Sequence, residues 1–151
     1  MDCCAPSNNT EAVKTECPSC GEKGKNVQLL TLKSLLKAST LETIEPENSY
    51  VFCSNPTCSI VYFSGNTQQT FVENDLKVTV YQKNQSADVP VCYCFDWTRE
   101  RLLQAVGTDQ KPADQIKSHV QAGRCGCEVN NPQGACCLGN VNAFVRSLKE
   151  V

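Results

Sequence analysis

The spacing of its cysteines constrains this chain more than any other feature. Twelve of the 151 residues are cysteine, against a single histidine and a single methionine. The cysteines fall into six closely spaced pairs: Cys3 and Cys4, Cys17 and Cys20, Cys53 and Cys58, Cys92 and Cys94, Cys125 and Cys127, and Cys136 and Cys137. Such pairs are typical either of a disulfide framework or of metal thiolates, and the cellular compartment decides between the two.

The N-terminal residues indicate a reducing compartment. They lack the basic and apolar regions of a secretory signal, and no apolar run approaches the roughly 18 residues that a membrane span requires. We therefore expect a cytoplasmic protein without membrane insertion. Glutathione and thioredoxin keep thiols reduced there, so metal thiolates explain the pairs better than disulfides do.

Charge and residue types exclude several other functions. The net charge is −2, so the chain has no basic stripe for a nucleic-acid backbone. No Ser/His/Asp grouping, glycine-rich phosphate loop or paired carboxylates in helical register occur, which excludes hydrolases and NTPases. We place His119 on a helix surface or core edge rather than among metal ligands. The sequence favours a metallochaperone or electron carrier over a dedicated enzyme.

The hydrophobic pattern predicts three regions. Residues 1–16 form a flexible tail that carries Cys3 and Cys4, because they show no sustained period. Residues 17–90 form a β-rich domain with strand-like runs at 50–52, 60–63 and 78–81, while 29–41 fits a helix equally well. The polar stretch 83–90 ends in a proline and suits a linker.

Residues 91–151 show a helical period instead. Thr98 is expected to cap a helix that ends at Gly107, and a second helix runs from Pro112 to Gly123. Asn140 caps a third, with apolar residues at helical spacing after it. The fold class is therefore α+β, a small β-rich module followed by a small three-helix module. Neither module has a hydrophobic core large enough for us to expect a stable fold without a cross-link such as a bound metal.

The first cysteine set predicts a closed zinc site. Cys17 and Cys20 form a two-residue knuckle followed by a glycine, and Cys53 and Cys58 lie across a turn between two strand-like runs. Four thiolates on two turns describe a tetrahedral Zn²⁺ site of the ribbon type. Such a site has no open position for water, so we expect it to stabilise the fold; a sensor or zinc-transfer role is the alternative.

The second set predicts an iron–sulfur cluster. Cys92 and Cys94 are two apart, so on an extended backbone they point the same way and could hold one iron, while two cysteines of the later loop hold a second. This satisfies the four-cysteine requirement of a [2Fe–2S] cluster. Helix N-termini at Thr98 and Asn140 would favour thiolates nearby. A second zinc is the main alternative, although Cys-x-Cys is a less usual zinc knuckle.

Four ordered motifs together resemble a known family. They are Cys17-Pro18-x-Cys20; Tyr50-Val51-Phe52-Cys53 to Cys58 with Val61-Tyr62-Phe63; Val91-Cys92-Tyr93-Cys94-Phe95; and Cys127-x3-Asn131-Pro132-x-Gly134-x-Cys136-Cys137. From about Cys17 onwards the chain resembles the N-terminal domain of CopZ-type copper chaperones. That domain joins a zinc ribbon to a [2Fe–2S] module like bacterioferritin-associated ferredoxin (BFD).

The resemblance implies both cofactors and a role in copper handling. Zinc would be held by Cys17, Cys20, Cys53 and Cys58, and the [2Fe–2S] cluster by Cys92, Cys94, Cys127 and Cys137. The protein would reduce Cu²⁺ and deliver Cu⁺ to a copper-transporting P-type ATPase or other export machinery, with electrons from a redox partner protein.

The sequence departs from that family at two places. The BFD pattern has Cys-x2-Cys as its second ligand pair, whereas this chain has Cys125-x-Cys127 and Cys136-Cys137. The Cys-x3-Asn-Pro stretch selects Cys127, and we choose Cys137 over Cys136 because it lies nearer the predicted helix cap. The Met-x-Cys-x-x-Cys motif of the CopZ copper-binding domain does not occur in the sequence.

Cys3 and Cys4 are left over and form a candidate hook for a soft ion, since two thiolates select Cu⁺ or Hg²⁺ over harder ions. The leading hypothesis is therefore a cytoplasmic zinc and iron–sulfur protein that handles copper or another thiophilic ion. The alternatives are a ferredoxin-like electron-transfer adaptor without a copper role and, less favoured on charge grounds, a zinc-ribbon nucleic-acid binder.

Overall fold

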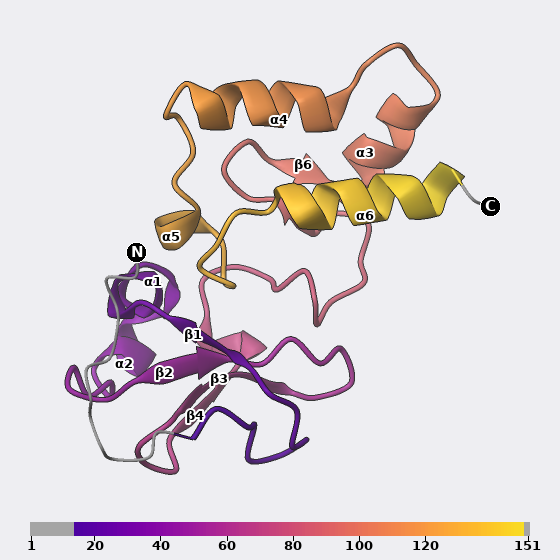
Figure 1. Ribbon diagram of the computed structural model, residues 1–151. Helices are drawn as coiled ribbons and strands as arrows, with labels where there is room; N and C mark the ends of the chain where they lie inside the picture. Colours follow the sequence, from indigo (N-terminus) through magenta and orange to yellow (C-terminus); the bar gives the residue numbers. More distant parts are fainter. Residues whose placement is uncertain (1–13, 150–151) are drawn as a thin grey trace.

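The structure is a computed structural model that describes residues 14–149. It contains a four-stranded sheet with two helices beside it, and a two-stranded hairpin surrounded by helices (Figure 1). The elements are β1 Lys25–Val27, α1 Leu29–Leu35, α2 Ala38–Leu41, β2 Tyr50–Phe52, β3 Ile60–Ser64, β4 Thr70–Val72, η1 Glu73–Asp75, β5 Pro90–Cys92, β6 Trp97–Thr98, α3 Arg99–Val106, α4 Pro112–Gln121, α5 Cys127–Asn130 and α6 Leu138–Lys149.

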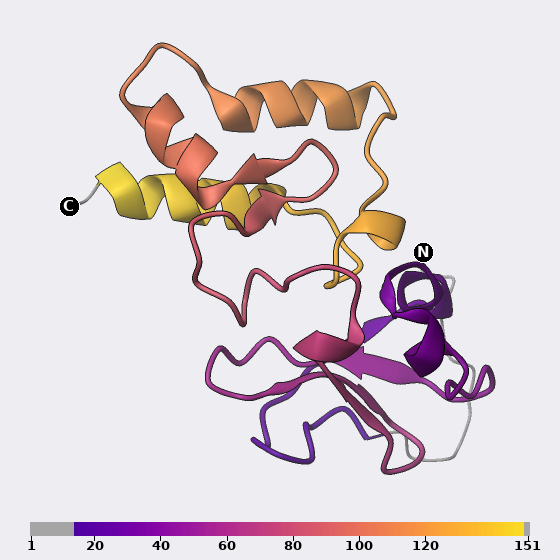
Figure 2. The same ribbon diagram turned by 180° about the vertical axis from the view of Figure 1, so that it is seen from behind.

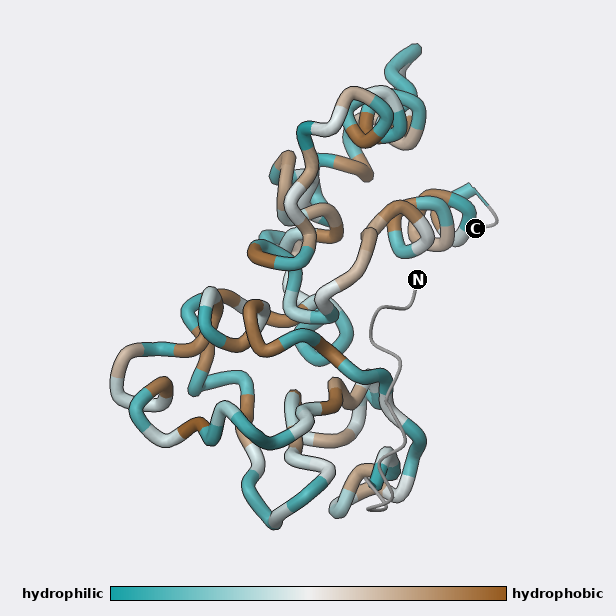
Figure 3. Tube along the Cα trace, turned by 60° about the vertical axis from the view of Figure 1, so that its left-hand side comes forward, coloured by the Kyte–Doolittle hydropathy of each residue, from teal (hydrophilic) through white to brown (hydrophobic). Residues whose placement is uncertain are grey.

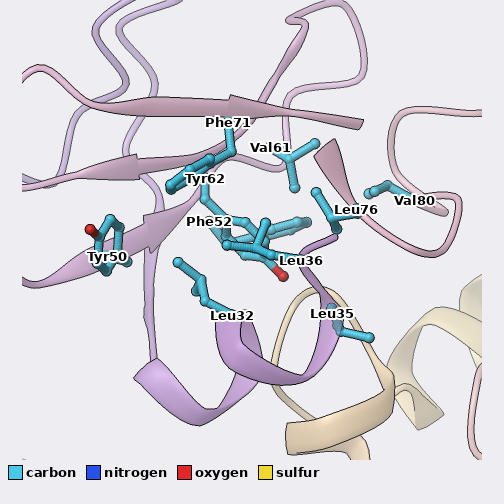
Figure 4. Packing of buried hydrophobic residues seen from close by; sticks show 10 residues of the cluster. All are labelled: Leu32, Leu35, Leu36, Tyr50, Phe52, Val61, Tyr62, Phe71, Leu76 and Val80. Carbon is cyan, nitrogen blue, oxygen red and sulfur yellow. The ribbon is translucent and has the colours of Figure 1, made fainter. Parts of the chain in front are cut away.

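The larger sheet is antiparallel throughout, in the order β1-β2-β3-β4, and its two central strands are buried on both faces. Side chains alternate along a strand, so neighbouring residues of β2 face opposite ways. Tyr50 and Phe52 pack into one core with the helix α1 (Figure 4), whereas Val51 packs with Phe63 and the first cysteine set. One face of the sheet therefore carries the apolar core, and the other carries the sulfur atoms.

Two sequence expectations in this region are resolved. The ambiguous stretch 29–41 forms the helices α1 and α2. The strand expected at 78–81 is wrong: the backbone N–H of Val80 donates to the Glu73 carboxylate at 2.8 Å, and a turn follows. Val80 is fully buried, so its apolar character reflects packing in the core rather than a place in the sheet.

The helices of the second half begin and end largely as expected. Thr98 caps α3 by accepting a hydrogen bond from the Arg101 N–H, and Gly107 follows its last residue; α4 begins at Pro112. The expected cap at Asn140 is wrong, because α6 already begins at Leu138 and Asn140 lies inside it. The hydropathy colouring in Figure 3 shows apolar and polar residues alternating along these helices, as expected for helices with one buried side.

The two halves touch where α5 lies beside α1 (Figures 1 and 2). The Thr31 hydroxyl of α1 donates to the backbone carbonyl of Glu128 at 2.7 Å, and Thr31 is fully buried. The Tyr62 hydroxyl of β3 donates to the carbonyl of Pro132. Both contacts hold the segment between Cys127 and Cys137 against the β-rich half.

Among residues 14–149, no helix combines the length and the apolar character that crossing a bilayer would require.

Candidate metal centres

The first cysteine set comes from two turns on one face of the sheet. Cys17 begins a tight turn in which the Gly21 N–H donates to its carbonyl at 2.9 Å, and Gly21 has a φ of 77°, a conformation that glycine adopts without strain. Cys53 directly follows β2, and Cys58 closes a second turn by donating its N–H to the Asn55 carbonyl at 3.1 Å. Hydrogen-bonded turns therefore hold both pairs in place.

The four sulfur atoms of this first set converge on one point. All of the Sγ atoms lie within 4.8 Å of one another, with 3.8 Å between Cys17 and Cys58 and 3.7 Å between Cys20 and Cys53. Zinc–sulfur bonds of about 2.3 Å give a tetrahedron with edges of roughly 3.8 Å, so the spacing fits Zn²⁺. A disulfide would need about 2.05 Å between the sulfurs, and all four cysteines are free.

Local hydrogen bonds and burial set the thiol chemistry here. Burial raises the pKa of Cys17 and raises the pKa of Cys53 to about 12, whereas the backbone N–H of Glu22 lowers the pKa of Cys20 to about 7. The ammonium of Lys83 lies 3.5 Å from the Cys53 sulfur. Sequence reasoning missed Lys83, because it is 30 residues from Cys53 and was read as part of a linker.

The second set is drawn from four different places in the helical half. Cys92 ends β5, Cys94 lies in the turn between β5 and β6, Cys127 begins α5, and Cys137 directly precedes α6. The Sγ atoms of Cys94 and Cys127 are 3.7 Å apart. Cys92 and Cys127 lie near enough to Cys137 to raise the pKa of its thiol. The structure therefore brings together the four cysteines that the sequence selected for this site.

Their mutual contacts perturb these thiols strongly. The neighbouring Cys137 thiol lowers the pKa of Cys92 to about 7 and that of Cys127 to about 6, and these two neighbours raise the pKa of Cys137. Burial raises the pKa of Cys94 to about 11. Two of the four sulfurs are therefore predisposed to the anionic form that metal binding requires.

The second set is also wider than the first. Among residues 14–149, only the first set has three or more ligand atoms that all lie within 4.8 Å of one another. In the second set, the sulfur–sulfur contact between Cys94 and Cys127 joins the hairpin to the later loop. Cys94 lies in a turn and not on the extended backbone expected for it.

The remaining cysteines differ in position. Cys136 is exposed, and its sulfur accepts a hydrogen bond from the Leu138 N–H at 3.5 Å, while Cys125 is half-buried. Neither takes part in the sulfur contacts that join the second set. The proposed hook of Cys3 and Cys4 lies outside the described residues.

Gly126 and Asn130 contact the second set without being thiols, and Tyr93, between Cys92 and Cys94, is held by hydrogen bonds of its own. The Gly126 N–H and the Asn130 side-chain amide donate to the Cys94 sulfur at 3.1 and 3.5 Å. The Tyr93 hydroxyl donates to the Thr79 carbonyl at 2.6 Å and accepts from the Tyr81 N–H at 2.9 Å. No sequence pattern predicts these hydrogen bonds, and only the closeness of Tyr93, Gly126 and Asn130 to cysteines along the chain could have indicated these residues.

The loop between Cys127 and Cys137 is organised by a buried asparagine. The Asn131 side chain donates to the Ala135 carbonyl at 3.1 Å and accepts from the Gln133 N–H at 3.1 Å. Gly134 has a φ of 70° and packs against α1, where an added Cβ would lie 3.1 Å from the Thr31 hydroxyl. The Asn-Pro-x-Gly stretch noted in the sequence therefore builds the turn that returns the chain to Cys137.

Comparison with known proteins relates the first set to a zinc-binding domain and most of the chain to CopZ proteins. Residues 14–77 match the family model described as a zinc binding domain of the CopZ type. The chain is 34% identical over 121 residues to the protein named copper chaperone CopZ from Archaeoglobus fulgidus, an alignment that covers 80% of this chain and 57% of that protein. The X-ray structure of the Archaeoglobus fulgidus CopZ N-terminal domain matches with a TM-score of 0.71 and 31% identity, covering 85% of this chain and 96% of that domain.

Proposed function

We infer the function of this chain from its family: it belongs to the CopZ family and matches the N-terminal domain of a CopZ protein along 96% of that domain's length. It spans little more than half of the curated CopZ relative, so the activity of that whole protein enters here as a proposal. We propose a cytoplasmic metal-handling protein with two thiolate centres, one for zinc and one for a [2Fe–2S] cluster.

For the first centre we propose Zn²⁺ held by Cys17, Cys20, Cys53 and Cys58. The match to a zinc-binding domain and the tetrahedral spacing of the four sulfurs support this assignment. All four positions of such a centre are filled by protein, so the zinc stabilises the fold and leaves no site for a substrate. By holding two turns of a small sheet together, the ion also adds stability that the small hydrophobic core of the β-rich half does not supply.

For the second centre we propose a [2Fe–2S] cluster held by Cys92, Cys94, Cys127 and Cys137. The observation that carries the proposal is that these four thiols meet in the helical half: the Cys94 and Cys127 sulfurs lie 3.7 Å apart, Cys92 and Cys127 shift the pKa of Cys137, and two donors are aimed at Cys94. A bound cluster of this type supplies one-electron chemistry. Buried surroundings and N–H groups directed at sulfur are the features that tune the potential of such centres.

The substrate proposed for this chemistry is copper or another soft ion. The name of the curated relative supports copper handling, and reduction of Cu²⁺ to Cu⁺ takes one electron, which a redox partner protein would supply. Cys3 and Cys4 are the candidate hook for Cu⁺, because thiolates prefer soft ions. The proposed recipient of Cu⁺ is a copper-transporting P-type ATPase or other export machinery.

Metal analysis of anaerobically purified protein tests the two centres. We expect one zinc, two irons and two sulfides per chain, and about one spin near g = 2 in the EPR spectrum after reduction. Two zincs without sulfide would refute the electron-transfer part of the proposal. In the Cys92→Ser variant, we expect iron and sulfide to be lost while zinc remains.

Titration with Cu⁺ tests the copper role separately. A Cys3→Ser/Cys4→Ser double variant should bind Cu⁺ more weakly than the parent chain. Equal affinity in the two proteins would reject the hook, and the absence of tight binding in both would favour a ferredoxin-like adaptor without a copper role.

A further inference from the structure

Lys83 is a charged residue beside the first centre, although the sequence places it in a linker. Its side-chain nitrogen Nζ donates to the Asn55 carbonyl at 2.7 Å and lies 3.5 Å from the Cys53 sulfur. Lys83 is half-buried, and Cys53 is almost fully buried. The ammonium therefore contacts both a ligand and the turn that carries the second ligand pair.

The charge of the proposed zinc centre explains why an ammonium group matters there. Four thiolates around Zn²⁺ carry a net charge of −2, and much of this charge is buried with the sulfurs. A cation that donates a hydrogen bond to a thiolate offsets part of that charge, and such bonds are stronger than neutral ones. Mutation of a group that contacts a metal's ligands, rather than the metal itself, typically lowers the affinity for the metal about 10- to 100-fold.

The backbone around Lys83 fixes its position from both halves of the molecule. The Lys83 N–H donates to the Val80 carbonyl at 2.9 Å, which forms the turn. The Arg99 guanidinium of α3 donates to the carbonyls of Tyr81 at 2.7 Å and Asn84 at 2.6 Å, on either side of Lys83. The start of the helical half therefore holds the turn from which Lys83 reaches the first centre.

We propose that Lys83 is a positioning residue of the zinc centre, whose ammonium holds the Cys53 thiolate and the Asn55 turn and slows the loss of zinc. This inference rests on the proposed zinc site. It assigns to the segment between the two halves a direct part in metal retention, beyond its role as a connection.

Zinc release to the chromogenic chelator 4-(2-pyridylazo)resorcinol tests the inference on the full chain. The Lys83→Met variant should release zinc about 10-fold faster than the parent or more, within the range typical of such contacts. Lys83→Arg keeps the charge and should restore slow release. Lys83→Gln keeps a hydrogen-bond donor without the charge, so its rate of zinc release should lie between those of Lys83→Met and Lys83→Arg. Lys33→Met, which removes an exposed lysine on α1, is the matched control and should behave as the parent.

Cobalt substitution gives a readout that general loosening of the fold would not produce. A hydrogen bond to a thiolate stabilises its lone pairs, so its removal should shift the thiolate-to-Co²⁺ charge-transfer band of Lys83→Met to longer wavelength, with Lys83→Arg near the parent. Unchanged release and an unshifted band in Lys83→Met and Lys83→Gln, in proteins that hold one zinc, would overturn the role of Lys83 and leave the zinc proposal standing. A parent chain without zinc would overturn both.

Discussion

Removal of the Tyr62 hydroxyl should loosen the loop that leads to Cys137. Tyr62 lies in β3 of the β-rich half and is fully buried, and its hydroxyl donates to the carbonyl of Pro132 in the helical half. The Tyr62→Phe substitution keeps the ring and its packing but leaves a buried carbonyl without this donor. Leaving a buried polar group unsatisfied costs about 1–3 kcal/mol of unfolding free energy.

This cost can be read as a change in melting temperature. For a chain of this size, 1 kcal/mol corresponds to roughly 2–4 °C, so the metal-loaded Tyr62→Phe protein should melt about 2–12 °C below the parent. Circular dichroism measures the melting temperature, and amide hydrogen exchange measures the loop at residues 131–137. We expect faster exchange there, because Tyr62 is one of the contacts that hold this loop on the sheet.

Tyr50→Phe is the matched control. The Tyr50 hydroxyl donates to Gln69 at 2.6 Å and accepts from the Glu45 N–H at 2.9 Å, and both partners lie within the β-rich half. This variant should also lose stability, yet it should leave exchange at 131–137 unchanged. The reasoning is refuted if Tyr62→Phe melts and exchanges like the parent, or if both variants loosen the loop equally.

Three further predictions concern the same contacts and the two centres. Thr31→Val keeps the shape of a fully buried side chain but removes its hydrogen bond to the Glu128 carbonyl; thermal melting should show a loss of about 1–3 kcal/mol, and an unchanged melting curve would contradict it. Cys137→Ser should abolish iron and sulfide binding while Cys136→Ser retains both, because Cys137 is buried among the other three thiols and shifts the pKa of Cys92, whereas Cys136 is exposed; equal losses in the two variants would reject the choice. Zinc affinity should rise with pH, because zinc displaces protons from thiols such as Cys53, whose pKa in the metal-free fold is about 12; competition with a chelator between about pH 6 and 8 measures this, and a flat profile would be inconsistent with thiolate ligation.

The sequence predicted elements best where the local signal is strong. Thr98 and Gly107 bound α3 because a capping hydroxyl and a glycine act within a few residues of the helix ends. The pattern at 78–81 was misleading, since β-branched residues are common both in strands and in cores, and only the tertiary contacts of Val80 distinguish the two. The short helix α5 was missed, because one turn at Cys127–Asn130 gives no measurable period.

In the candidate centres, too, local patterns in the sequence were predictive and tertiary contacts were not foreseen. Paired spacing selected the first set of four cysteines, whereas in the second set the family resemblance selected Cys127 and nearness to an expected helix cap selected Cys137. The structure brings the members of each set together. The contacts around the cysteines could not be predicted from the sequence, because Lys83, Asn130 and Tyr62 contact partners that only the folded chain brings near. Spacing can therefore select ligands for a site, but the hydrogen bonds that tune the site depend on the tertiary fold.

Native mass spectrometry of the intact, anaerobically purified chain tests the central claim most directly. The account predicts the mass of the polypeptide with one zinc ion and one [2Fe–2S] unit, the zinc persisting when the iron is removed by mild oxidation. A metal-free mass that lacks two hydrogens for each cysteine pair would instead show disulfides, and would contradict the assignment of both sets as thiolate centres.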